Sequence, residues 1–149
     1  MIGFIGLGIL GKPKAIKLIK AGYKLIVYDK LAILDKLLSM GAEGAVSNRE
    51  VALKSNIIIT MLPNFVQVKE AILGTGGVIE GLKSGSIVME MSSVSPDLSR
   101  ELADAVVQKN AAFLDKNITI TEGADKAVLE KIEPILSAMG VNAPQRTLA

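Results

Sequence analysis

The chain has 149 residues, of which half are hydrophobic, and its formal net charge at pH 7 is +2. This length suits a single core, so we expect residues 1–149 to form one domain. The small charge gives no indication of a nucleic-acid partner. The absence of cysteine and histidine excludes disulfides, thiolate nucleophiles, the usual zinc sites and a Ser-His-Asp triad, so no metal site is expected.

The apolar runs of the chain are short. Residues 57–59 are three consecutive isoleucines, whereas a membrane-spanning helix needs about 20 apolar residues. The first apolar run begins directly after Met1, with no signal peptide before it. We therefore expect no membrane partner and a cytoplasmic protein.

Short apolar runs alternate with longer runs of helical periodicity as far as residue 110. The predicted strands cover residues 2–5, 25–28, 44–46, 56–61 and 86–91, and the predicted helices cover residues 9–21, 32–40, 48–53, 65–73 and 96–110. Gly22 and Gly41 are suited to end the first two helices, while Asn48 and Ser95 are predicted N-caps. Apolar strands that alternate with helices indicate an α/β fold with a doubly wound, parallel sheet of the Rossmann type.

The last third of the chain has a different pattern. Strand-forming runs at residues 112–114 and 118–121 flank the turn signal Asp115-Lys116-Asn117. Because no crossover helix fits between these runs, they are predicted to pair as a C-terminal antiparallel hairpin. A closing helix is predicted at residues 124–139, where Pro134 is expected to kink or interrupt it.

A glycine-rich loop follows the first predicted strand and opens the first predicted helix. Its residues are Gly6, Leu7, Gly8, Ile9, Leu10 and Gly11. Within a βαβ unit this spacing is typical of dinucleotide binding. Gly6 permits a tight turn, Gly8 lets a pyrophosphate approach the backbone, and Gly11 lets helix and strand pack closely. The loop is therefore predicted to bind a dinucleotide cofactor, with a plain turn as the alternative.

An acidic residue, Asp29, ends the second predicted strand eighteen residues after Gly11. A carboxylate at this place accepts hydrogen bonds from the adenosine ribose and repels a 2′-phosphate, which favours NAD over NADP. Lys30 beside it leaves NADP as an alternative, because its ammonium group is able to pair with a 2′-phosphate. The other interpretation of Asp29 is an ordinary strand-end cap.

Three segments carry a more specific signal. They are GFIGLGILGKP at residues 3–13, IITMLPN at 58–64 and EMSSVSP at 90–96. Together they resemble the β-hydroxyacid dehydrogenase family, of the 3-hydroxyisobutyrate dehydrogenase and tartronate semialdehyde reductase type, over residues 2–115. The resemblance implies an oxidoreductase in which Leu62, Pro63 and Asn64 border the nicotinamide half of the cofactor and Ser93 lies beside the nicotinamide ring. From the residues alone, Pro63 ends a strand and Ser93 belongs to a helix-capping loop.

The chain also departs from the family pattern. Leu10, Lys14 and Lys17 stand where the family usually has Met, Met and Asn. After Asp115 the chain lacks about a dozen residues, which in the family form the substrate loop, and it has no counterpart of the helical domain with the catalytic lysine. The catalytic residues are therefore unknown, and an engineered or naturally truncated cofactor-binding core is expected.

Three interpretations of the function stay open. The chain is a module that binds NAD and catalyses little, an active oxidoreductase working with a partner domain or alone, or a stable scaffold with weak cofactor binding. A homodimer is expected through the edge strand at residues 118–121 or through the last helix, since a β-branched edge strand is a template for pairing. The alternative is a monomer whose closing helix covers the apolar face.

Overall fold

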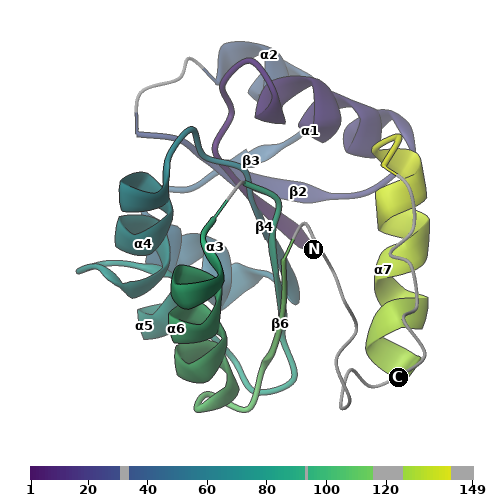
Figure 1. Cartoon of the computed structure of the whole chain (residues 1–149). Helices are drawn as coiled ribbons and strands as arrows, with labels where there is room; N and C mark the ends of the chain where they lie inside the picture. Colours follow the sequence, from purple (N-terminus) through teal and green to yellow (C-terminus); the bar gives the residue numbers. More distant parts are fainter. Residues whose placement is uncertain (31–33, 93, 116–125, 142–149) are drawn as a thin grey trace.

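The structure, a computed structural model, describes residues 1–30, 34–92, 94–115 and 126–141. In these residues the strands form one sheet in the order β3-β2-β1-β4-β5-β6, and each neighbouring pair is parallel (Figure 1). The strands are β1 (Ile2–Ile5), β2 (Leu25–Tyr28), β3 (Glu43–Gly44), β4 (Ile57–Thr60), β5 (Ile87–Glu90) and β6 (Ala112–Asp115). The order reverses between β1 and β4, where a doubly wound sheet leaves a crevice beyond the carboxyl ends of its strands.

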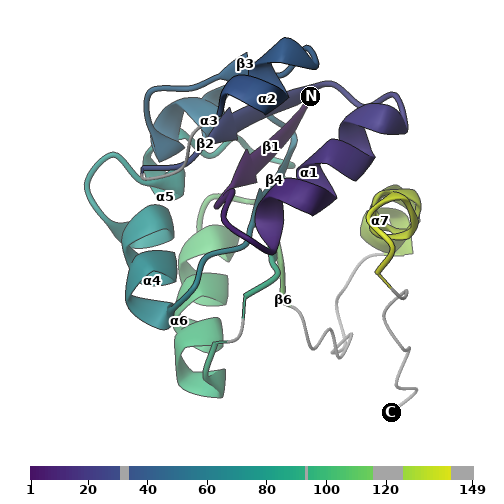
Figure 2. The ribbon, with the colours of Figure 1, turned by 90° about the horizontal axis from the view of Figure 1, so that it is seen from above.

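Helices cover both faces of the sheet. They are α1 (Gly11–Lys20), α2 (Asp35–Ser39), α3 (Asn48–Lys54), α4 (Phe65–Leu73), α5 (Val78–Gly81), α6 (Pro96–Val107) and α7 (Lys126–Ala138). Side chains of α1, α2 and α7 share one core cluster with Ile59 of β4, and those of α3 to α6 share a second with Ile58. Neighbouring strand residues point to opposite faces, so the doubly wound fold predicted from the sequence is confirmed. Figure 2 shows α7 beside α1, which it contacts.

Most predicted elements are present, with differences at their ends. The third strand is Glu43–Gly44 rather than residues 44–46, and the short helix α5 was not predicted. The second strand of the predicted hairpin lies outside the described residues. None of the helices within the described ranges is long and apolar enough to cross a bilayer.

Of the kink or interruption expected at Pro134, the interruption is wrong, because α7 continues through this residue, and the kink stays a prediction. Proline supplies no N–H to the carbonyl of Glu130, one turn earlier. Both residues are exposed, so water is able to satisfy that carbonyl. The buried face of α7, with Leu129, Ile132 and Ile135, packs into the core. This packing holds the helix although the backbone hydrogen bond to the Glu130 carbonyl is missing.

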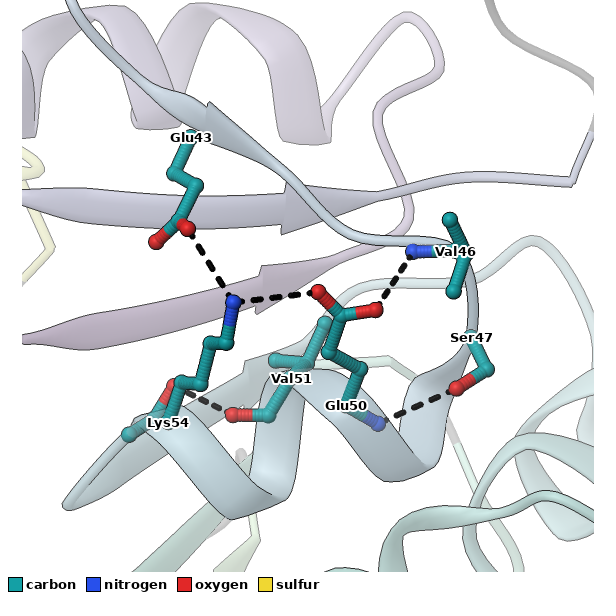
Figure 3. A network of polar contacts seen from close by, with 7 residues as sticks. Glu43, Val46, Ser47, Glu50, Val51 and Lys54 are labelled. Atoms are coloured by element: carbon teal, nitrogen blue, oxygen red, sulfur yellow. Dashed lines mark hydrogen bonds and ion pairs between the residues drawn. The ribbon is translucent and has the colours of Figure 1, made fainter.

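The N-cap of α3 is Ser47, not Asn48 as the sequence analysis predicted. The Ser47 hydroxyl accepts a hydrogen bond from the Glu50 N–H at 3.1 Å, and the Glu50 carboxylate accepts one from the Val46 N–H at 3.2 Å (Figure 3). This Ser-x-x-Glu pattern is a capping-box signal that the sequence contained. The bond from Val46 and the ammonium group of Lys54 lower the pKa of Glu50. The arrangement fixes the loop before α3 beside the crevice.

Candidate functional site

A cleft of about 980 Å³ lies at the point where the strand order reverses. Residues from the ends of β1, β2 and β4 line it, together with residues from the starts of α1 and α3 and from α4. The predicted cofactor-binding residues among them are Gly6, Gly8, Ile9, Leu10, Gly11, Asp29, Lys30, Leu62 and Pro63. Ser93 lies outside the described residues.

The three glycines of the loop have different surroundings. Gly6 has φ +94°, and a Cβ there would lie 2.1 Å from the Met61 carbonyl oxygen. A Cβ on Gly11 would lie 1.9 Å from the Gly6 carbonyl oxygen. A Cβ on Gly8, in contrast, would meet no atom within 4 Å. Gly6 and Gly11 are therefore required by the fold, whereas Gly8 leaves open space in the cleft.

The start of α1 has no capping group of its own. No side chain caps its first turn, and that turn contains no acidic residue. The N–H of Lys12 bonds to the Gly8 carbonyl at 3.1 Å, which fixes the loop against the helix. The N–H groups at a helix start carry a partial positive charge. Here that charge borders the cleft, which suits an anion such as a phosphate.

Asp29 anchors the glycine loop to the end of β2. Its Oδ2 accepts a hydrogen bond from the Leu7 N–H at 2.6 Å. The Leu7 side chain is buried in the core, so this residue offers only its backbone to the loop and does not line the cleft. The sequence analysis assigned Asp29 to a ribose or to a strand-end cap, and it missed this link across the loop.

Lys30 has a partner that the sequence analysis missed. Its Nζ lies 3.8 Å from Oε1 of Glu70 on α4, and both residues line the cleft. The two side chains are 75% and 65% exposed, so the pair is a weak, solvent-screened one. The lysine next to Asp29 is thus engaged by a second carboxylate.

The loops after β4 and β5 are joined by a hydrogen bond. The Leu62 N–H donates to the Ser92 hydroxyl oxygen at 2.7 Å, which fixes the turn that carries Leu62 and Pro63 at the cleft wall. Asn64 lies at the start of α4. Its Oδ1 accepts a hydrogen bond from the Gln67 N–H at 2.9 Å as the N-cap of α4, and it does not line the cleft.

A buried carboxylate, Glu90, lies at the end of β5 beneath these loops. It accepts hydrogen bonds from the Thr60 hydroxyl and from the Ser92 N–H. Burial raises the pKa of Glu90 above its ordinary value, and the neighbouring charge of Asp115 adds to this. Glu90 thereby ties β4 and β5 to the Ser92 loop. An acid directly after Ile-Val-Met in a buried strand was the available sequence signal.

We expect Glu90→Gln to flatten the dependence of the free energy of unfolding on pH. The folded-state pKa of Glu90 is raised, so its protonated form stabilises the fold fully below the unfolded pKa. That stabilisation is lost as the pH rises through the folded pKa, with a slope of at most about 1.4 kcal/mol per pH unit for one proton. Urea unfolding from pH 4 to pH 8 measures this slope. The control Asp104→Asn, at an exposed position of α6, should keep the wild-type slope, and an unchanged slope in Glu90→Gln would contradict the interpretation.

The comparisons with known proteins agree with this geometry. Residues 1–146 match the family described as the NAD binding domain of 6-phosphogluconate dehydrogenase. The chain belongs to this family. Its curated relatives include proteins named 2-hydroxy-3-oxopropionate reductase and 3-hydroxyisobutyrate dehydrogenase, so the resemblance found in the sequence is confirmed.

Two relatives and one solved structure illustrate the match. The 2-(hydroxymethyl)glutarate dehydrogenase of Eubacterium barkeri is 38% identical, over 93% of this chain and 50% of that protein. The 2-hydroxy-3-oxopropionate reductase of Escherichia coli (strain K12) is 35% identical, over 95% of this chain and 52% of that protein. The structure described as Psf3 in complex with NADP+ and 2-OPP has a TM-score of 0.84 at 20% identity, covering 99% of this chain and 56% of that one, which shows a shared fold.

The chain spans about half the length of the curated relatives it matches. The match to the Eubacterium barkeri protein extends over 152 positions, more than the 149 residues of this chain, although it covers only 93% of them. Positions of the relative therefore have no counterpart here. This agrees with the predicted lack of about a dozen residues.

Proposed function

We propose that residues 1–149 form a single dinucleotide-binding domain that binds NAD in the cleft at the ends of β1, β2 and β4. The observation that carries the proposal is the open space at Gly8, next to the uncapped start of α1. A pyrophosphate there would meet backbone N–H groups and a favourable helix dipole. The family of the chain supports NAD as the ligand.

The remaining cleft residues fit the two ends of this cofactor. Asp29 directly follows β2 and lines the cleft, where its carboxylate would accept hydrogen bonds from the adenosine ribose. Leu62, whose N–H is bound by Ser92, and Pro63 would border the nicotinamide end, and Ser93, the residue after Ser92 in the sequence, would lie beside the nicotinamide ring. The cofactor supplies the hydride-transfer chemistry when it is bound, and these residues bind and orient it.

For the catalytic role we propose the cofactor-binding half of an oxidoreductase of the β-hydroxyacid dehydrogenase type. Its relatives carry dehydrogenase and reductase names, and the chain corresponds to about half of each. Because the chain spans only about half the length of these relatives, we propose that residues 1–149 by themselves bind NAD and catalyse little.

Titration with NADH tests the proposal directly. The reduced nicotinamide absorbs at longer wavelengths than any protein side chain, so the emission of NADH excited in that band reports binding without protein background. We expect saturable enhancement of that emission, and weaker binding of NADPH. Addition of 2-hydroxy-3-oxopropionate to the NADH complex should cause no turnover by the chain alone. Turnover would favour the complete oxidoreductase, and the absence of binding would refute the proposal.

We also propose a homodimer that pairs through the edge of the sheet rather than through α7. In the described residues β6 is the last strand of the sheet, with Ala112 and Phe113 half-buried. The apolar face of α7 already packs against the core of its own chain, which argues against the helix as the interface. Sedimentation equilibrium at micromolar concentration should give the mass of two chains, and a monomer at all concentrations would contradict the pairing.

A further inference from the structure

We propose that Glu70 is a specificity-determining residue that discriminates against a 2′-phosphorylated dinucleotide. The inference rests on the proposed binding of a dinucleotide in the cleft and names the residue that selects between its two forms. Glu70 belongs to α4, outside the glycine loop and outside the segment after β2 from which the sequence analysis argued cofactor choice.

Charged side chains of both signs lie near Asp29 at the cleft. With its adenosine ribose at Asp29, a dinucleotide would present its 2′-position beside Lys30, the next residue. Lys30 Nζ lies 3.8 Å from the carboxylate of Glu70, which belongs to α4 and also lines the cleft. A 2′-phosphate would therefore meet two carboxylates and one lysine that is already paired. The local charge is unfavourable for NADP although a lysine is present.

The ion pair between Lys30 and Glu70 is weak. Both side chains are well exposed, 75% for Lys30 and 65% for Glu70, and exposed pairs contribute little to stability. A 2′-phosphate is thus able to compete for Lys30, but Glu70 opposes it by holding the lysine and by direct repulsion. NAD carries only a hydroxyl at this position and meets neither effect. Glu70 should consequently change the affinity for NADP and leave that for NAD nearly constant.

A substitution of Glu70 tests cofactor selectivity more specifically than a substitution of Asp29. The Asp29 carboxylate accepts the Leu7 N–H, so its replacement disturbs the glycine loop as well as the charge. The Glu70 side chain makes its ion pair on the exposed side of α4, while its backbone carbonyl accepts the Gly74 N–H at the end of the helix. Glu70→Gln removes the charge and leaves that backbone bond in place.

The test is the ratio of the dissociation constants for NADPH and NADH. We expect Glu70→Gln to lower the Kd for NADPH by about two- to fivefold, the range of an exposed ion pair, with an almost unchanged Kd for NADH. This improvement in NADPH affinity should become smaller as the salt concentration rises from about 0.01 to 0.15 M, because dissolved ions screen the electrostatic interactions of these charges. The matched control is Glu101→Gln, which removes another exposed ion pair, that with Lys69 at 3.2 Å; neither Glu101 nor Lys69 lines the cleft.

A double-mutant cycle with Lys30→Ala separates the two effects of Glu70. In the Lys30→Ala background only the direct repulsion is left, so Glu70→Gln should improve NADPH binding less than it does in the wild type. An equal change for both cofactors, or the same change in Glu101→Gln, would overturn the inference while NAD binding itself stands. If the wild type binds neither dinucleotide, the proposed function fails and the inference fails with it.

Discussion

Gly8→Val should weaken NADH binding strongly and leave the chain folded. A Cβ at Gly8 meets no protein atom within 4 Å, so the valine methyl groups would occupy the cleft rather than the core. There they would keep the pyrophosphate away from the backbone N–H groups at the start of α1. We expect a loss of affinity on the order of 100-fold, equivalent to about 2.7 kcal/mol, measured by NADH fluorescence.

Two measurements make this expectation specific to the ligand. The midpoint of urea unfolding of Gly8→Val should stay close to that of the wild type, because nothing in the protein contacts the new side chain. Gly8→Ala, with one methyl group, should weaken binding less than Gly8→Val. An unchanged NADH affinity in Gly8→Val would show that the pyrophosphate does not approach this loop, and with it the assignment of the site would be wrong.

The parts of the site that the sequence predicts are those determined by neighbouring residues. Gly6, Gly8 and Gly11 owe their roles to one turn between a strand and a helix, and that turn is readable from spacing. The strands were equally readable, because Ile57–Thr60 and Ile87–Glu90 are short, almost entirely apolar and separated by helical sequence. Local sequence patterns of this kind are therefore sufficient to predict where the cleft lies.

The parts that escaped prediction depend on contacts between distant segments. Glu70 meets Lys30 only because α4 and the segment after β2 line the same cleft, forty residues apart in the sequence. The bond from Leu62 to Ser92 likewise requires the parallel register of β4 and β5. Spacing along the chain contains no information on such pairs. The Ser47 cap is a different case, because its capping-box partner Glu50 was visible and Asn48 was preferred in error.

We expect Gly11→Ala to destabilise the fold strongly, whereas the same methyl addition at Gly8 has little effect on stability. The added Cβ would lie 1.9 Å from the Gly6 carbonyl oxygen and 3.3 Å from Phe4 Cε1, both of which belong to the buried junction of β1 and α1. The Gly6 carbonyl oxygen belongs to the backbone and is unable to rotate away from the new methyl group as a flexible side chain would. Helix α1 would therefore have to move away from the sheet. Overpacking of a core costs about 1–3 kcal/mol, and occasionally more, and we expect the upper end of that range here.

Urea unfolding followed by circular dichroism measures this loss, with Gly8→Ala as the matched control. Both variants add one methyl group to the same loop, and only the one at position 11 meets protein atoms. Gly8→Ala should therefore unfold at nearly the wild-type urea concentration, while Gly11→Ala unfolds much earlier or fails to fold. Equal midpoints for the two variants would contradict the close approach of α1 to β1. A difference confined to position 11 would separate the two roles of the motif, in which Gly11 serves the packing of the fold and Gly8 leaves room for the ligand.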